Sequence, residues 1–239
     1  MDVKKESVLI VGAGPGLGRA LGFAFARAGW PVGLTGRSEA VDALAGEIDG
    51  EGLAAQALRY DAADEKAVAE AVAEAQAALG PIGVLVYNAG NMVRGDVQEI
   101  EPEAFRAAFA TGPYGAFLHA RAVLPGMLSR GGGSILFTGA TSALRAPARA
   151  PAFAAAKFGL RGLAMSLARR WGPEGIHVAH VVVDGVIRTP RSASYLGPDE
   201  PAILPDDLAA GYVALALQPR SAWTFELDLR PAGDDIGDN

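Results

Sequence analysis

The 239-residue chain contains no cysteine. Disulfides, thiol nucleophiles and cysteine-ligated zinc are therefore excluded, no metal site is predicted, and the absence fits a reducing compartment. Basic residues are also few: 21 Lys and Arg stand against 27 Asp and Glu, the net charge is −6, and no run of five basic residues occurs. This balance argues against nucleic acid or an anionic membrane as a partner.

Long hydrophobic runs are absent as well. No stretch of about 18 consecutive apolar residues occurs, so no membrane span is predicted. The apolar run Val8–Val11, which follows Lys4 and Lys5, is too short for the core of a signal peptide. We therefore expect a cytoplasmic protein. Half of the residues are apolar, which is enough to bury the core of a single α/β domain spanning residues 1–239.

Short β-branched and apolar runs alternate with alanine-rich amphipathic stretches. Seven runs predict strands, at Val8–Val11, Val32–Thr35, Ala54–Tyr60, Val84–Tyr87, Ile135–Thr138, Val178–Val183 and Trp223–Leu229. This alternation predicts an α/β fold of the Rossmann type, in which helices flank a doubly wound, seven-stranded parallel sheet. The last run alternates polar and apolar residues, as expected near a sheet edge. Residues 190–205 are predicted to form a loop over a substrate cleft, and residues 233–239 a flexible tail.

A glycine-rich turn, Gly12-Ala13-Gly14-Pro15-Gly16-Leu17-Gly18, joins the first predicted strand to a helix. Such a turn lets backbone N–H groups and a helix N-terminus meet a pyrophosphate, because a side chain at Gly12 or Gly16 would block close approach. The turn therefore predicts a dinucleotide site. A turn without a ligand is the alternative.

The second predicted strand ends at Thr35-Gly36-Arg37-Ser38. An NAD-binding domain places an acid here for the ribose 2′-hydroxyl, whereas an arginine suits a 2′-phosphate. Arg37 therefore favours NADP(H) over NAD(H). The alternative is an exposed arginine at the edge of the sheet.

Further motifs follow in a characteristic order: Tyr60-Asp61-Ala62, Tyr87-Asn88-Ala89-Gly90, Phe153-x-x-x-Lys157 and Asp184-Gly185-x-Ile187-x-Thr189. Together with the glycine turn they resemble the short-chain dehydrogenase/reductase family over nearly the whole chain. By this resemblance, Asp61 and Ala62 contact adenine, Ile187 and Thr189 hold the nicotinamide carboxamide, and Lys157 binds the nicotinamide ribose. The full set of cofactor-binding residues implied is Gly12, Pro15, Gly16, Leu17, Gly18, Arg37, Ser38, Asp61, Ala62, Asn88, Ala89, Gly90, Lys157, Ile187 and Thr189. Asn88 has an alternative reading as a simple turn residue after a strand.

The family's proton relay uses Asn, Ser, Tyr and Lys. Lys157 stands in its expected place and is the one catalytic residue predicted. Aligned on Lys157, the tyrosine position holds Phe153, the serine position Ala140 and the asparagine position Gly112. The pattern is similar to a small branch of the family that has Phe in place of the catalytic Tyr. Loss of a positioned acid costs on the order of 10²–10⁴ in rate.

Three side chains are candidates to replace the lost acid, and each has a structural alternative. Ser142 follows the serine position and is equally suited to a turn, Tyr114 lies near the asparagine position and starts a helix, and Tyr195 lies in the predicted cleft loop, where it also suits an apolar cover. A converging group of arginines is a second possibility, binding an anionic substrate, although scattered surface arginines are more common. These arginines are Arg145, Arg149, Arg188 and Arg191. Structural roles are favoured for His119, His177 and His180.

The leading expectation is an NADP(H)-dependent oxidoreductase that transfers hydride to or from a small carbonyl or alcohol without the usual Tyr/Ser relay. A non-catalytic NADP(H)-binding sensor or scaffold is the alternative from another class, and a lyase or isomerase on the same fold is a third. By resemblance, the chain forms a homodimer or homotetramer through the helix of Lys157 and the long helix before it.

Overall fold

The computed structural model describes residues 6–197 and 199–232. All strand pairs in it are parallel, and the sheet order is β3-β2-β1-β4-β5-β6-β7. The predicted doubly wound, seven-stranded parallel sheet is thus confirmed. The strands are β1 (Ser7–Val11), β2 (Val32–Gly36), β3 (Ala55–Arg59), β4 (Ile82–Tyr87), β5 (Gly133–Thr138), β6 (Ile176–Val183) and β7 (Glu226–Leu229).

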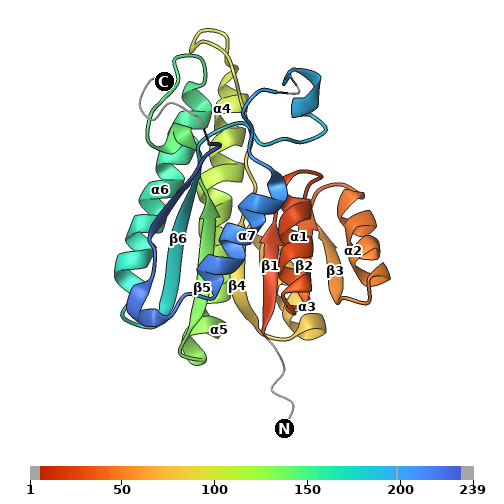
Figure 1. Ribbon diagram of the computed structural model, residues 1–239. Coiled ribbons are helices and arrows are strands. Elements are labelled where there is room, and N and C mark those ends of the chain that lie inside the picture. The colour runs from red at the N-terminus through yellow and green to blue at the C-terminus, as the bar shows by residue number, and fades with distance from the viewer. Residues whose placement is uncertain (1–5, 198, 233–239) are drawn as a thin grey trace.

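Helices cover both faces of the sheet. The helices are α1 (Leu17–Arg27), α2 (Ala40–Gly50), α3 (Glu65–Leu79), α4 (Pro102–Phe109), α5 (Gly115–Ser129), α6 (Pro151–Trp171) and α7 (Pro205–Ala216). Buried residues of α1, α2 and α7 form one core cluster, and those of α3, α5 and α6 form another on the opposite face. Figure 1 shows α1 and α7 as neighbours over the centre of the sheet.

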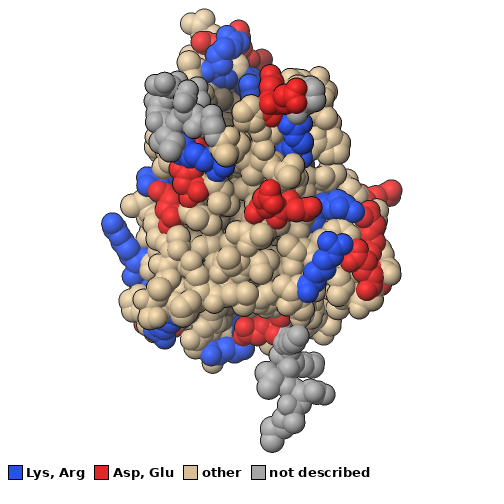
Figure 2. Space-filling view, in the orientation of Figure 1, with Lys and Arg blue, Asp and Glu red and all other residues tan. Residues whose placement is uncertain are grey.

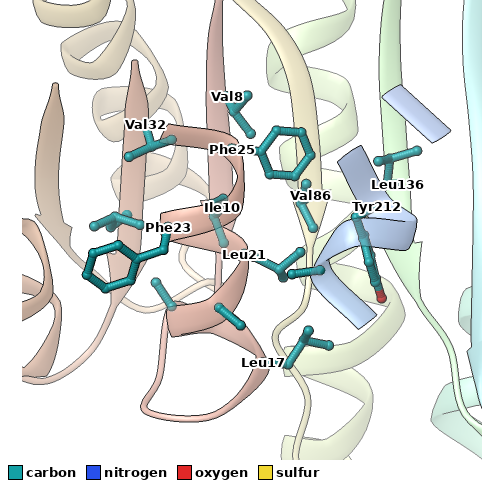
Figure 3. Packing of buried hydrophobic residues seen from close by; sticks show 14 of the residues in the cluster. Val8, Ile10, Leu17, Leu21, Phe23, Phe25, Val32, Val86, Leu136 and Tyr212 are labelled. Carbon is teal, nitrogen blue, oxygen red and sulfur yellow. The ribbon is translucent and has the colours of Figure 1, made fainter. Parts of the chain in front are cut away.

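Successive residues of the central strands enter different cores. Val8 and Ile10 of β1 pack in the α1/α7 cluster, whereas Leu9 and Val11 pack in the α3/α5/α6 cluster. Figure 3 shows Val8 and Ile10 in the first cluster beside Phe25 of α1. Because both faces are buried, the strand reads as a continuous apolar run in the sequence.

The last strand is shorter than predicted. The sequence pattern begins at Trp223, but β7 begins at Glu226. Trp223 instead stacks on His177, with ring centroids 4.9 Å apart, and Thr224 donates its N–H to the side chain of Gln218. Side-chain contacts therefore take the place of strand pairing at Trp223 and Thr224, so alternation alone misplaced the start of the strand. The predicted edge position of the strand is confirmed.

The order of the strands creates a crevice. β1 lies between β2 and β4: the sheet is extended from β1 towards β3 on one side and, from β4 onwards, towards β7 on the other. Open parallel sheets bind ligands at such a switch point, beside the carboxyl ends of the strands. The loop that follows β6 rises above this edge (Figure 1). Across the described ranges no helix is both long and apolar enough to cross a membrane. Figure 2 shows charges of both signs scattered over one face, without a continuous basic patch. The predicted tail, 233–239, lies outside the described residues.

Candidate functional site

Two adjoining cavities open at the carboxyl edge of the sheet. The first, about 590 Å³, runs from the glycine turn to the ends of β2 and β3, and the second, about 870 Å³, lies over the ends of β5 and β6. Asn88, Gly90 and Arg191 line both, so the two form one groove. Of the predicted cofactor residues, the first is lined by Gly12, Gly16, Arg37, Ser38, Asp61, Ala62, Asn88, Ala89 and Gly90, and the second by Asn88, Gly90, Lys157, Ile187 and Thr189.

Pro15, Leu17 and Gly18 do not line either cavity. The Leu17 side chain is buried in the α1/α7 core, and a Cβ on Gly18 would lie 2.4 Å from the carbonyl oxygen of Gly12. Because Leu17 is the first residue of α1, only its backbone faces the turn. The three residues shape the turn rather than the walls of the groove.

Gly12 and Asn88 lock β1 to β4 where the groove begins. Gly12 has φ +88°, and a Cβ there would lie 2.7 Å from the backbone nitrogen of Ala89. The Asn88 side chain donates to the Gly12 carbonyl at 2.9 Å, and its backbone N–H donates to Val11 at 2.8 Å. Asn88 is therefore more than a turn residue, because its hydrogen bonds hold the end of β4 against the start of the glycine turn.

The end of the groove at β2 carries an unpaired cation. Arg37 is exposed, and within the described part of the chain it has no hydrogen-bond or ion-pair partner. Asp61, the acid that lines the same cavity, accepts from the backbone N–H of Ala63 at 2.9 Å. A dianionic group at this end would therefore find a guanidinium that no carboxylate has already neutralised.

The other end of the groove contains Lys157 on α6. Its side chain is buried, with the residue 7% exposed, and Nζ donates to the Thr138 carbonyl at 2.6 Å. Burial lowers the pKa of this ammonium to about 8. Nζ also lies 5.6 Å from the centroid of the Phe153 ring. A lysine with a perturbed pKa at the wall of a cleft is a feature of functional sites.

Comparisons with known proteins agree with this geometry. The model of the family described as short chain dehydrogenase matches residues 6–197. The chain belongs to the short-chain dehydrogenase family. A protein named probable galactose dehydrogenase GalD, from Rhizobium meliloti (strain 1021), is 34% identical over 192 residues that span 80% of this chain and 75% of the relative.

Two further relatives of this short-chain dehydrogenase family member bear on its chemistry. Inactive 2-(S)-hydroxypropyl-CoM dehydrogenase 2 of Xanthobacter autotrophicus is 36% identical over 174 residues, 72% of this chain and 74% of its own. The crystal structure of a gluconate 5-dehydrogenase from Burkholderia cenocepacia J2315, in complex with NADP and tartrate, has a TM-score of 0.85 and 25% identity, and the match covers 95% of this chain and 94% of the other. Dehydrogenase relatives support an oxidoreductase.

Ala140 and Phe153, which the sequence motifs predict at the family's serine and tyrosine positions, carry side chains without a proton to exchange. Ala140 follows β5 and Phe153 lies in the first turn of α6, and both line the second cavity. Gly112 lies in the kinked segment Ala110–Tyr114, and a Cβ there would lie 3.2 Å from the Cβ of Ala156. An asparagine at position 112 would therefore meet α6.

Asp184, which follows β6, is the centre of a buried ion pair that the sequence motifs did not predict. It accepts from the Thr141 hydroxyl and pairs with Arg145 at 3.2 Å and Arg230 at 2.8 Å. Its neighbour Gly185 has φ +153°. The network ties the chain after β7 to the wall of the second cavity, where Pro231 is one of the lining residues.

The four arginines do not converge, which agrees with the more common arrangement of scattered arginines. Arg145 pairs with Asp184, Arg149 pairs with Glu99 at 2.8 Å, and Arg188 donates to the Glu200 carbonyl at 2.9 Å. Of the four, Arg191 alone lines the groove, where it is joined by Arg94, which lines the second cavity. The other guanidinium groups turn away because carboxylates and a carbonyl from distant parts of the chain lie closer to them.

The three histidines are buried. His119 Nδ1 donates to the Gly115 carbonyl, so its Nε2 accepts from the Tyr60 hydroxyl, each at 2.7 Å, and burial lowers its pKa to about 4. His180 Nδ1 bonds Glu226 at 3.0 Å, a carboxylate that is distant in sequence. His177 bonds the Thr224 carbonyl at 2.9 Å. No histidine lines the two cavities.

The three candidate replacement acids do not share one location. Ser142 is buried in the short 3₁₀ helix Thr141–Ala143 and lines the second cavity. Tyr195 also lines it but is 65% exposed. Tyr114 lies outside both cavities and is 45% exposed. The loop predicted over the cleft contributes Arg191, Ser192, Tyr195, Leu196, Glu200 and Pro201 to the lining.

Replacing Gly12 with alanine is expected to destabilise the protein, while the same change at Gly46 stabilises it. At Gly12 the new Cβ meets the Ala89 backbone at 2.7 Å in a left-handed conformation, so we expect a loss of about 1–3 kcal/mol. Gly46 lies exposed within α2 with nothing within 4 Å of an added Cβ, so alanine there gains about 0.5–1 kcal/mol. Urea unfolding of both variants checks the opposite signs, and an equal effect at the two sites contradicts the assigned close approach.

Proposed function

We propose that the protein is an NADP(H)-dependent oxidoreductase that transfers hydride to or from a small carbonyl or alcohol substrate without the family's Tyr/Ser relay. The observation that carries the proposal is the continuous groove, which joins an unpaired arginine at one end to a buried lysine at the other. Its length and chemistry suit a dinucleotide with a 2′-phosphate. When bound, a reduced nicotinamide supplies the hydride.

In this proposal, different residues of the groove bind different parts of the cofactor. The backbone of Gly14 and Gly16 and the N-terminus of α1 take the diphosphate, because an added Cβ on Gly14 meets nothing within 4 Å and the turn is open there. Arg37 and Ser38 take the 2′-phosphate. In the same scheme Asp61 and Ala62 hold adenine, Asn88, Ala89 and Gly90 line the ribose, Lys157 binds the nicotinamide ribose, and Ile187 and Thr189 hold the carboxamide.

The relatives support a polyhydroxylated substrate. One is named for galactose, and the gluconate 5-dehydrogenase structure holds NADP together with tartrate. The second cavity here, about 870 Å³, has room for a molecule of that size beside the nicotinamide end. A small sugar, polyol or sugar acid is therefore the substrate class proposed.

Calorimetry and absorbance test the proposed function in two steps. Titration with NADPH is expected to show binding, and stopped-flow absorbance at the reduced nicotinamide band is expected to show oxidation of NADPH with part of a panel of keto-sugars and keto-acids. Absence of NADPH binding rejects the assignment. Binding without oxidation across the panel favours the second candidate.

The second candidate is a non-catalytic NADP(H)-binding sensor or scaffold. Ala140 and Phe153 in the cavity wall favour it, because neither offers a hydroxyl to a substrate oxygen. The relative from Xanthobacter autotrophicus is named inactive. In either case we propose a homo-oligomer formed through α5 and α6, on which Phe117 and Phe158 are 45% and 44% exposed.

A further inference from the structure

Most hydroxyl groups in the wall of the second cavity already donate elsewhere or are paired. The Thr138 hydroxyl pairs with the Tyr212 hydroxyl at 2.7 Å, the Thr141 hydroxyl donates to Asp184, and the Ser192 hydroxyl donates to the Ile187 carbonyl at 2.7 Å. These hydroxyl groups are occupied by hydrogen bonds within the protein. None of these three is positioned as an acid for a substrate in the cavity.

The Thr189 hydroxyl donates to the Ser192 hydroxyl at 3.3 Å, and the other two hydroxyls lack an activating neighbour. Ser142 is buried with no base within hydrogen-bond distance among the residues described, and a serine needs such a base to exchange its proton. Tyr195 is 65% exposed on the loop, where water solvates it. Arg94 and Arg191 also line the cavity, but guanidinium groups stay protonated in proteins.

Lys157 is different because it lines the same cavity and its ammonium retains free donors. An ammonium has three N–H groups, and the described residues supply one acceptor, the Thr138 carbonyl at 2.6 Å. The Phe153 ring occupies the place beside Nζ, at 5.6 Å from its centroid. With no hydroxyl on Phe153 or Ala140 between them, a substrate oxygen in this cavity can approach Nζ itself.

The charged groups around Lys157 are already paired with one another. Arg161, one turn further along α6, forms two hydrogen bonds to Glu226 of β7, at 2.6 and 2.9 Å, and Glu226 also bonds His180 of β6. Asp184 is held by two arginines. Glu200, which lines the same cavity, accepts from the Gly197 N–H at 2.9 Å. Burial lowers the pKa of the Lys157 ammonium to about 8, and none of the described carboxylates offsets this shift. Both charge states of Lys157 are therefore accessible near neutral pH, as a general acid or base requires.

We propose that Lys157 is the direct proton donor and acceptor of this site, replacing the tyrosine rather than assisting it. The inference rests on the proposed function. In reduction, the carbonyl carbon gains hydride from the reduced nicotinamide, the π electron pair moves to the oxygen, and that oxygen takes a proton as an N–H bond of Lys157 breaks. Nitrogen keeps the bonding pair and becomes a neutral amine, which water reprotonates. In oxidation, the neutral amine takes the proton of the alcohol, the O–H bonding pair forms the carbonyl π bond, and the carbon gives its hydride to the oxidised nicotinamide.

The pH dependence of the unmutated protein is the first test. The rate of reduction is expected to fall above about pH 8, because the ammonium loses its proton, and the rate of oxidation is expected to rise up to that pH. A reduction rate that is independent of pH from 6 to about 10 overturns the proposal. Absence of any turnover rejects the proposed function, whereas turnover at a rate that does not depend on pH rejects this inference alone, so the two failures are distinguishable.

Two variants separate proton transfer from cofactor binding. Lys157→Arg keeps a cation and donors for Thr138 and the ribose but does not release its proton. We expect NADPH affinity to change little while the rate of hydride transfer falls about 10²-fold or more and loses its decline above pH 8. Lys157→Gln tests the same loss without the larger guanidinium. If either folded variant retains the unmutated rate, Lys157 is not the acid.

A titration independent of turnover completes the test. In ¹⁵N-lysine-labelled protein without cofactor, the Nζ signal that disappears in Lys157→Gln identifies this residue. Its chemical shift is expected to titrate with a midpoint near pH 8, about two units below the midpoint of a free lysine side chain. A midpoint at the value of a free lysine overturns the proposal, because the group would then remain an ammonium throughout the working range.

Discussion

The double variant Ala140→Ser/Phe153→Tyr is expected to reduce carbonyl substrates on the order of 10²-fold faster than the unmutated protein. Both positions line the second cavity, and Phe153 already lies beside Lys157. A phenol at position 153 would place an acid next to the lysine, and a serine at position 140 would polarise the substrate oxygen. We expect the lower end of the usual 10²–10⁴ range because Lys157 already supplies a proton in the scheme proposed above.

Stopped-flow measurement of NADPH oxidation checks this gain, with each single variant measured alongside. Phe105→Tyr is the control, because Phe105 lies on α4, is 40% exposed and is outside the cavity. The control is expected to leave the rate unchanged. No gain in a folded double variant that binds NADPH contradicts an oxidoreductase site and favours the sensor or scaffold.

Replacing Arg37 with alanine is expected to lower the affinity for NADPH about 10–100-fold while leaving the affinity for NADH unchanged. Hydrogen bonds to a charged group contribute about 1.5–3 kcal/mol, and each 1.4 kcal/mol is tenfold in binding. Because Arg37 is exposed and forms no ion pair among the described residues, the change removes contacts to the ligand without disturbing the fold.

Calorimetric titration with both cofactors measures this preference. Arg106→Ala is the control, since Arg106 is an exposed arginine whose partner is Glu103 on the same helix, far in sequence from the glycine turn. An equal loss of affinity for NADPH and NADH in Arg37→Ala would place the arginine elsewhere on the cofactor. No loss for either would assign it to the surface alone.

Elements governed by local chemistry were predictable. The strand Val8–Val11 was found to within one residue, because its run of β-branched and apolar side chains is characteristic of a strand buried on both faces. The glycine turn was also found, because a positive φ at Gly12 needs a residue without Cβ. The start of β7 was missed, since a stacked pair of rings at His177 and Trp223 decides it.

The sequence indicated individual residues of the groove but not which charged side chains form ion pairs with one another. Lys157, predicted from the Phe153-x-x-x-Lys157 motif, and Arg37, predicted from its place at the end of the second strand, both line the groove, whereas the sequence did not predict Asp184 as the centre of a buried ion-pair network. Its partner Arg145 lies 39 residues away, and Arg230 approaches from the far end of the chain. Spacing in the sequence does not reveal which carboxylate a guanidinium meets once helices and strands have packed.

The sequence by itself determined the parallel sheet and the glycine turn, because these depend on residue type and local spacing. The tertiary structure decided which arginines pair with Asp184 and Glu99 and which hydroxyls form hydrogen bonds within the protein. It also decided that Nζ of Lys157 is buried and has N–H groups without an acceptor among the described residues. Those outcomes depend on contacts between segments far apart in the chain, where burial sets the pKa and the nearest partner takes the hydrogen bond.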